Sequence, residues 1–332
     1  MIFHPIIIAL YVSSVLITFM VIYACFYGIQ ILRSWDIRSG SELQLILERK
    51  TYLISTLLIY AFGCELLSLF LYVFTADHLH TFFAGAMCAA GSLYVNGYGY
   101  PALVVKIINF LFAGLWLILN YADNRGYDYP LIKKKYLLLL VLAPLVVTET
   151  ILQVNYFLRL RPNIITSCCG SLFSTEGPGV MSEILLLPEI PMTVGFYCSM
   201  LLFALCGVYY LLRGKGAYLF AAASALTFLI SILSVITCIS VYFYELPTHH
   251  CPFCILQGEY GYIGYPLYLT LFGGTIAGIG VGTLAPFSRI PSLAEIIPPL
   301  QRKLALASLI LFLIFGAIAT HRILVSGLVL QG

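Results

Sequence analysis

Residues 1–30 read MIFHPIIIALYVSSVLITFMVIYACFYGIQ. This apolar run is long enough to cross a bilayer by itself, which takes about 20 residues. It has neither a basic n-region nor a small-residue cleavage site. The run therefore indicates a retained first membrane helix rather than a signal peptide.

The composition of the whole chain favours a membrane environment. Of its 332 residues, 61% are hydrophobic and 9% are charged, whereas soluble proteins carry about 25% charged residues. The mean hydropathy is +0.99. In lipid the backbone polar groups must be satisfied within the protein, and the sequence lacks the short alternating strands of a barrel. We therefore expect an all-α fold with the lipid bilayer as its main partner. No Lys/Arg patch is interleaved with aromatic residues, which excludes nucleic acid as a partner.

Seven more apolar runs of about 20 residues follow the first one. The eight expected spans cover residues 6–32, 52–75, 99–121, 136–158, 191–212, 216–244, 263–285 and 304–327. The chain is thus predicted to be a polytopic integral membrane bundle. We expect a first four-helix half over residues 1–158, an outer loop with adjacent cysteines over 159–190, and a second four-helix half over 191–332.

Basic residues concentrate in four connections that fall on one side of this alternating topology. They are Arg33, Arg38, Arg49 and Lys50, then Arg125, Lys133, Lys134 and Lys135, then Arg213 and Lys215, and finally Arg289, Arg302 and Lys303. Basic loops favour the cytoplasmic side. Both termini are therefore expected on the outer side of a plasma or inner membrane.

Cysteine and histidine residues gather in the loops on the opposite, outer side. These loops carry His78, His80, Cys88, Cys168, Cys169, His249, His250, Cys251 and Cys254. Five other cysteines lie inside predicted helices, where an unpaired cysteine usually behaves as a small buried hydrophobe. Because outer compartments are commonly oxidising, the loop cysteines are the candidates for redox chemistry.

Two segments half a chain apart are similar to each other. CAAGSLYVNGYGYPALVVKIINF begins at Cys88 and CILQGEYGYIGYPLYLTLFGG begins at Cys254, and each enters its helix through Gly-Tyr-Pro. One interpretation is the duplication of a four-helix unit. The other is that Gly, Tyr and Pro are common where helices enter a membrane.

The most informative stretch is HHCPFCILQGEYGYIGYPL, residues 249–267, with a Cys-x-x-Cys just before a membrane helix. Cysteines at this spacing form reducible disulfides, and helix N-terminal amides favour a thiolate. We therefore expect Cys251 and Cys254 to form a redox pair, with Cys168 and Cys169 exchanging electrons with an outer thiol protein. Static bridges are the alternative, although five outer cysteines leave one over.

The stretch over residues 251–266 resembles the DsbB and vitamin K epoxide reductase type of membrane thiol-disulfide oxidoreductase. Gln257 and Tyr265-Pro266 match that pattern, while Gly258 stands where the family has a basic residue near its quinone. The resemblance implies an oxidoreductase that passes electrons between outer cysteine pairs and a lipid-soluble acceptor such as a quinone, which Gln257 would help to position. Since these proteins are normally four-helix bundles, eight helices would imply a doubled or enlarged relative.

Three charged residues fall inside predicted spans, namely Glu65, Lys106 and Glu149. Such residues are costly in a membrane and are functional candidates by default. Lys106 is expected to pair with Glu65 or Glu149 below the outer loops. The group could then replace the missing basic residue near a quinone or serve a proton path, and a purely structural ion pair is the alternative.

The outer loops also allow two competing interpretations. His78, His80, His249 and His250, together with the cysteines, are the ligand types that zinc and copper favour, although the adjacent His249 and His250 cannot easily face one metal ion. No Cys-x-x-Cys-His motif is present, so covalent c-type haem is not expected. The chain could instead be a noncatalytic subunit of a larger respiratory or biogenesis complex, with other subunits docked on these loops.

Overall fold

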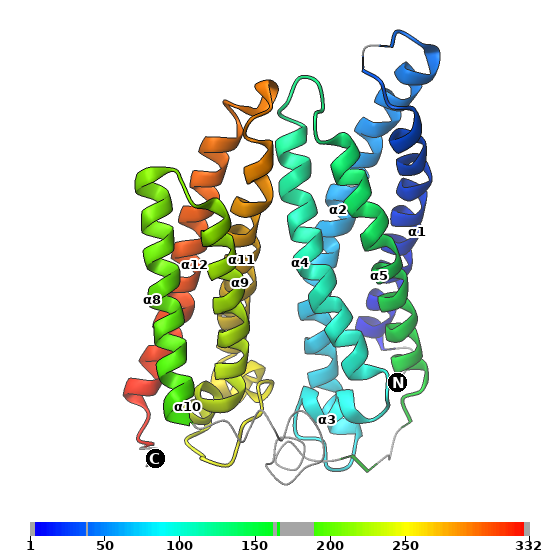
Figure 1. Ribbon diagram of the computed structural model, residues 1–332. Helices are drawn as coiled ribbons and strands as arrows, with labels where there is room; N and C mark the ends of the chain where they lie inside the picture. Colours follow the sequence, from blue (N-terminus) through cyan, green and yellow to red (C-terminus); the bar gives the residue numbers. More distant parts are fainter. Residues whose placement is uncertain (1–3, 38, 162–164, 167–188, 329–332) are drawn as a thin grey trace. The chain divides into compact units, whose positions relative to one another are not determined.

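The computed structural model describes residues 4–37, 39–161, 165–166 and 189–328, and these residues form helices without any named strand (Figure 1). In the described part of the chain, eight helices are long and apolar enough to cross a membrane. The predicted all-α polytopic fold is therefore confirmed, and the chain is a multi-pass membrane protein.

The long helices follow the order of the predicted spans. They are α1 (Pro5–Ser34), α2 (Glu42–His78), α4 (Gly99–Asp123), α5 (Ile132–Leu158), α8 (Glu189–Arg213), α9 (Ala217–Ser234), α11 (Gly264–Leu284) and α12 (Ile297–Val325). Short helical elements extend or connect them. They are η1 (Leu79–Phe82), α3 (Ala89–Tyr94), the π-helical η2 (Val235–Ile239), α10 (Ser240–Tyr244), η3 (Cys254–Leu256), η4 (Gly258–Tyr260), η5 (Ala285–Phe287) and η6 (Pro291–Leu293).

The largest difference from the prediction is the start of α2, which begins at Glu42 and not at residue 52. Local polar contacts explain this early start. The Ser41 hydroxyl accepts a hydrogen bond from the Gln44 amide at 3.3 Å, as an N-cap residue does. One turn later the Gln44 side chain donates to Glu48 at 2.8 Å. Such i,i+4 contacts extend a helix beyond its apolar run.

The chain packs as two compact units. Unit 1 consists of Met1–Thr75, Asn96–Leu160 and Pro286–Leu300, and unit 2 consists of Ala76–Val95, Arg161–Ala285 and Gln301–Gly332. Unit 1 therefore contains α1, α4, α5 and most of α2, and unit 2 contains α3, α8 to α11 and most of α12. The predicted halves and their duplication stay predictions.

In unit 1, α5 packs against both α1 and α4. The rings of Phe62 and Trp116 meet edge to face at 5.0 Å, and the Trp116 indole donates to the Lys135 carbonyl at 3.1 Å. Aromatic pairs of this kind add specific geometry to apolar burial. They fix α2, α4 and α5 around a common core.

In unit 2, α9 packs against both α8 and α11. The ring of Phe203 lies 5.1 Å from that of Phe220 and 4.5 Å from that of Phe312. One turn after Phe220 on α9, the hydroxyl of Ser224 lies against Gly278 of α11, where a side chain would collide with it. Small residues let membrane helices approach closely.

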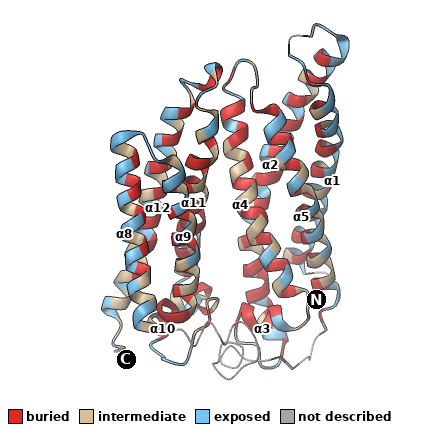
Figure 2. Ribbon diagram, viewed as in Figure 1, coloured by how far each residue is buried: buried red, intermediate tan, exposed pale blue. Residues whose placement is uncertain are grey.

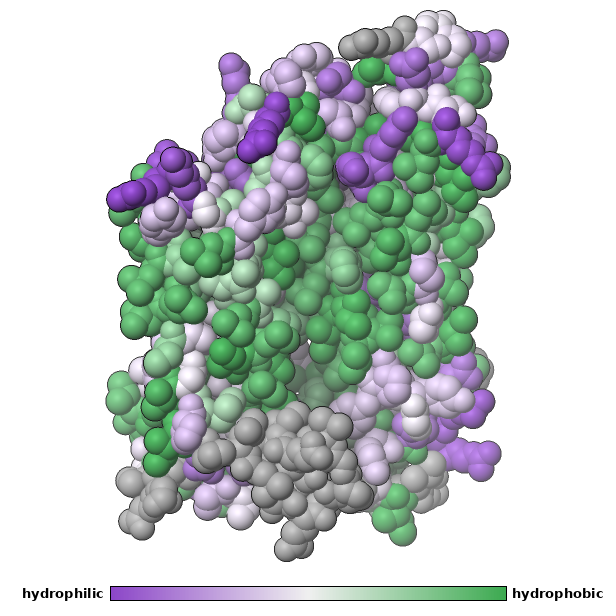
Figure 3. Space-filling view, in the orientation of Figure 1, coloured by the Kyte–Doolittle hydropathy of each residue, from purple (hydrophilic) through white to green (hydrophobic). Residues whose placement is uncertain are grey.

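The outward faces of the long helices are apolar. In each unit, buried residues follow one face of a helix and exposed ones the other (Figure 2). The exposed faces carry large side chains such as Phe19, Leu67 and Leu313, which are 70%, 70% and 71% exposed. Hydrophilic residues lie towards the helix ends (Figure 3). A surface this apolar fits contact with lipid rather than water.

Candidate functional site

Three cysteines from two distant loops meet in unit 2. The Sγ atoms of Cys88, Cys251 and Cys254 all lie within 4.8 Å of one another, and those of Cys88 and Cys251 are 3.5 Å apart. Cys88 and Cys251 are fully buried, and Cys254 is 6% exposed. We call these three residues the cysteine cluster.

Cys88 occupies the N-cap position of α3. Its Sγ atom accepts a hydrogen bond from the Ala90 amide at 3.4 Å. Upstream of it, Gly85 has a φ of +89° and lies directly against the backbone carbonyl of Thr166. A side chain at Gly85 would be strained and would also collide with that carbonyl. This close approach fixes the path of the loop that carries Cys88.

The loop with Cys251 and Cys254 is anchored by two tyrosines. The Tyr244 hydroxyl donates to the Cys251 carbonyl and accepts a hydrogen bond from the Ile255 amide at 3.0 Å. The Tyr268 hydroxyl donates to the Pro252 carbonyl at 2.7 Å. Because α10 and α11 supply these hydroxyls, the backbone on both sides of Cys254 is tied to membrane helices.

Asp77 and Gln257 fasten the two cysteine loops to each other. The Asp77 Oδ1 atom accepts hydrogen bonds from the Ala89 amide at 3.1 Å and from the Gln257 side chain at 3.2 Å. The same Gln257 nitrogen also donates to the Met87 carbonyl at 2.9 Å. Gln257 thus contacts Met87 directly and is linked to Ala89, the other neighbour of Cys88, through Asp77. Its expected part in positioning a quinone stays a prediction.

The four predicted histidine ligands lie in different surroundings. His249 Nε2 is 3.4 Å from Cys254 Sγ, and the His249 ring packs edge-on against Tyr244 at 4.5 Å. His250 instead directs Nδ1 to the Thr237 carbonyl at 3.1 Å. The two adjacent histidines therefore face different groups, as expected for neighbouring positions in the chain. His80 contacts the Asp77 carbonyl, and His78 is exposed at the end of α2.

Cys168 and Cys169, the predicted exchanging pair, lie outside the described residues. The nearest described residue, Thr166, is bound to the Cys88 loop. Its amide donates to the Ala84 carbonyl at 2.9 Å, and its hydroxyl donates to the Gly91 carbonyl at 3.0 Å. Thr166 therefore lies beside the loop that carries Cys88.

A cavity of about 500 Å³ lies in unit 2, lined by Phe243, Tyr260, Ile263, Ile318, His321 and Arg322 among others. The Tyr260 ring contacts that of Tyr244 at 5.0 Å, and Tyr244 is the residue that holds the Cys251 carbonyl. Partial burial raises the pKa of Tyr260 above its usual value, and the nearby Cys254 raises it further. One pair of tyrosines therefore connects this cavity with the cysteine cluster.

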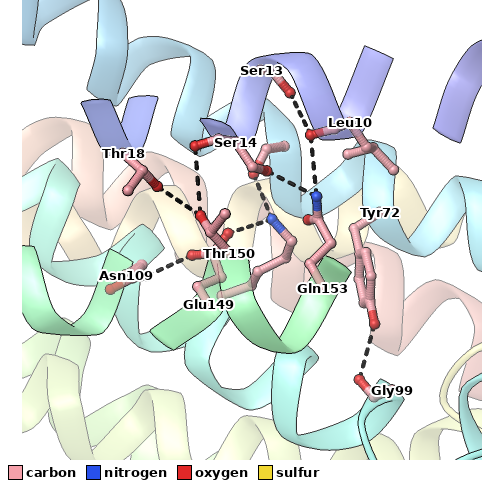
Figure 4. A network of polar contacts seen from close by, with 12 residues as sticks. Leu10, Ser13, Ser14, Thr18, Tyr72, Gly99, Asn109, Glu149, Thr150 and Gln153 are labelled. Carbon is pink, nitrogen blue, oxygen red and sulfur yellow. Dashed lines mark hydrogen bonds and ion pairs between the residues drawn. The ribbon is translucent and has the colours of Figure 1, made fainter. Parts of the chain in front are cut away.

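The charged residues predicted inside the membrane meet in unit 1. Lys106 Nζ lies 2.5 Å from Glu149 Oε1 and donates to the Ser68 hydroxyl at 2.9 Å. Asn109 donates to the other Glu149 oxygen at 2.5 Å (Figure 4). Glu65 is buried in the same cluster, with its carboxyl group hydrogen-bonded to that of Glu149. The expected pairing of Lys106 with a membrane carboxylate is present.

A second buried ion pair in unit 1 corrects the assignment of Lys135 to a basic loop. Lys135 lies in the first turn of α5, and its Nζ atom is 2.7 Å from Asp123 Oδ2, with both side chains fully buried. Asn120 and Ser55 also accept hydrogen bonds from Lys135. This lysine therefore stabilises the interior of unit 1 and adds no positive charge to the surface.

The sequence includes Cys88 among the outer loop cysteines but does not pair it with Cys251, and it gives no role to Asp77 or Tyr244. The place of Cys88 in the site could have been found from the similarity between its segment and the one that begins at Cys254. Asp77 and Tyr244 carry no comparable signal, because their roles depend on backbone groups brought together by the fold.

No protein-family model, curated protein or solved structure matches this chain.

Proposed function

We propose that the chain is a membrane thiol-disulfide oxidoreductase whose reacting groups are Cys88, Cys251 and Cys254. The observation that carries the proposal is the 3.5 Å separation of Cys88 Sγ and Cys251 Sγ. A thiolate that attacks a disulfide must approach one of its sulfur atoms directly. Cys88 needs only a small movement to do so.

The exchange step is balanced within the cluster. The Cys88 thiolate attacks Cys251 of a Cys251–Cys254 disulfide, the Cys88–Cys251 bond forms, and Cys254 leaves as a thiolate. His249 Nε2, 3.4 Å from Cys254 Sγ, supplies a proton to the leaving thiolate and removes it in the reverse step. This is general acid-base catalysis by a positioned histidine.

Net turnover requires an electron donor and an electron acceptor. We propose an outer thiol protein as the donor and a lipid-soluble acceptor such as a quinone. The cavity beside Tyr260 and Arg322 has room for a small ring. The basic connections favour an orientation with the cysteine cluster and both termini on the outer side of a plasma or inner membrane.

Redox-dependent alkylation tests this proposal. Protein purified without oxygen is treated with a dithiol or with a soluble ubiquinone analogue, and each cysteine is then mapped by mass spectrometry. The quinone analogue should leave two of the three cluster cysteines bridged and the dithiol should leave all three alkylated, while Cys206, buried in α8, serves as the internal control. An alkylation pattern that neither reagent changes at the cluster would sink the proposal.

A second candidate function is the binding of a thiophilic metal ion. Three sulfur atoms within 4.8 Å of one another, with an imidazole nitrogen beside one of them, match the ligand set of a tetrahedral Cys₃His site. Zinc–sulfur bonds of about 2.3 Å place such sulfurs at similar separations. Binding would need all three thiolates and would exclude a disulfide.

Metal analysis separates the two candidates. The metal-binding function predicts stoichiometric zinc or copper in anaerobically purified protein, lost in Cys88→Ser and reduced in His249→Ala. His250→Ala is the matched control, because His250 faces Thr237. Protein that is metal-free and still exchanges disulfides would leave thiol exchange as the function.

A further inference from the structure

The buried residues Glu65, Lys106, Asn109 and Glu149 form the polar cluster of unit 1. This cluster contains more carboxyl groups than cations. Glu65, Lys106 and Glu149 are 3%, 1% and 1% exposed, so two carboxyl groups share one ammonium group away from water. The other buried lysine of the unit, Lys135, is paired with Asp123. An ionised carboxyl group buried without a cation is strongly unfavourable. One of the two glutamates must therefore be neutralised by something other than a cation.

Geometry shows which carboxyl group is left over. Glu149 has Lys106 on one oxygen and Asn109 on the other, so its ionised form is well stabilised. Glu65 lies one turn from Ser68 on α2, and its carboxyl group is hydrogen-bonded to that of Glu149. Ionised carboxylates only accept hydrogen bonds. A hydrogen bond between these two groups must therefore contain a proton.

The same cluster has acceptor atoms to spare. The side-chain carbonyl oxygens of Asn109 and Gln153 are buried, and within the described part of the chain no donor reaches either of them. Gln153 lies one turn from Glu149 on α5, and its nitrogen donates to Ser14 of α1 (Figure 4). Buried acceptor atoms that lack donors favour a protonated group nearby, because its hydrogen can be donated to an acceptor.

We propose that Glu65 and Glu149 bind one proton inside the membrane-embedded part of unit 1 and exchange it with water. The proton enters from water onto Glu65, which donates it towards Glu149, and it returns to water when Glu65 ionises. Lys106 and Asn109 keep Glu149 as the acceptor throughout. This proton site does not depend on the cysteine chemistry of unit 2.

Infrared spectroscopy of the whole protein in lipid tests the proposal. A protonated carboxylic acid has a C=O stretching band that is separate from carboxylate bands, and the band shifts when deuterium replaces the proton. Protein labelled with ¹³C-glutamate should show this band moved by the label and shifted in D₂O. The labelled protein needs no substitution, so the result does not depend on whether a variant folds.

Substitutions then locate the proton. Glu65→Gln should abolish the glutamic acid band, whereas Glu42→Gln, at the exposed start of α2, should leave it unchanged. Lys106→Met removes the cation that keeps Glu149 ionised, and the band should then grow about twofold. Absence of a glutamic acid band from the labelled protein, or its survival in folded Glu65→Gln, would overturn the proposal.

Discussion

Cys88 Sγ and Cys251 Sγ lie 3.5 Å apart although 163 positions separate the two residues in the sequence. The contact joins the loop before α3 to the loop after α10, and hydrogen bonds from Gln257 to Asp77 and Met87 hold the two loops together. A redox pair alone would need only Cys251 and Cys254. In the proposed function, the third sulfur is an internal partner for exchange.

Replacement of His249 should slow disulfide exchange. His249→Ala removes the proton donor and acceptor beside Cys254, and the loss of such a group costs on the order of 10²-fold in rate. His250→Ala should leave the rate unchanged, because its ring faces Thr237. Stopped-flow measurement of thiol release in both variants checks this prediction, and equal rates would exclude a role of His249 as acid or base.

Tyr244→Phe should loosen the Cys251 loop. The change removes a hydroxyl that both donates to the Cys251 carbonyl and accepts from the Ile255 amide, which leaves buried backbone groups unpaired at a cost of about 1–3 kcal/mol. We expect a lower melting temperature and faster alkylation of Cys254 after reduction. Tyr242→Phe, two residues earlier on α10, is the control. A Tyr244→Phe protein indistinguishable from that control would contradict the anchoring role.

The buried pair of Asp123 and Lys135 should dominate the stability of one end of unit 1. Lys135→Met leaves Asp123 buried without its cation, which costs about 3–5 kcal/mol. Denaturant unfolding in detergent should show this loss. Lys134→Met, with an exposed side chain, should change little, and the Asp123→Asn/Lys135→Met double variant should recover part of the loss. A Lys135→Met protein as stable as Lys134→Met would refute the assignment.

The predicted orientation is tested by labelling single introduced cysteines. Ser326→Cys, beyond the end of α12, should react with a membrane-impermeant maleimide in intact cells. Lys134→Cys, in the first turn of α5, should react only after the cells are permeabilised, because basic connections favour the cytoplasmic side. The unmodified chain provides the background from native cysteines. The reverse pattern would place the cysteine cluster on the inner side.

Hydropathy and length were sufficient to predict the eight spans, because a membrane helix is a local property of about 20 consecutive residues. Polar helical segments beyond the apolar run were missed, as at Glu42–Lys50, where capping and i,i+4 contacts extend α2. A count of basic residues assigns Lys135 to a loop, because it carries no information about a partner such as Asp123.

The candidate site was predictable only in part. The Cys-x-x-Cys spacing identifies Cys251 and Cys254 as candidate site residues. The cost of placing charges in a membrane identifies Lys106, Glu65 and Glu149 in the same way. Proximity between distant segments is not predictable from sequence, so the contact of Cys88 with Cys251 and the anchoring of its loop by Asp77 required the folded chain. The choice between Glu65 and Glu149 as the partner of Lys106 likewise required the distances in the folded chain.

The Cys254→Ser variant tests the central claim most directly. Without Cys254 a Cys88–Cys251 disulfide cannot be resolved within the cluster, so mild oxidation followed by mass spectrometry should trap that bond, and Cys206→Ser should show no such accumulation. Recovery of Cys88 and Cys251 fully alkylated after oxidation, in a folded Cys254→Ser protein, would contradict an exchange site built from these three cysteines.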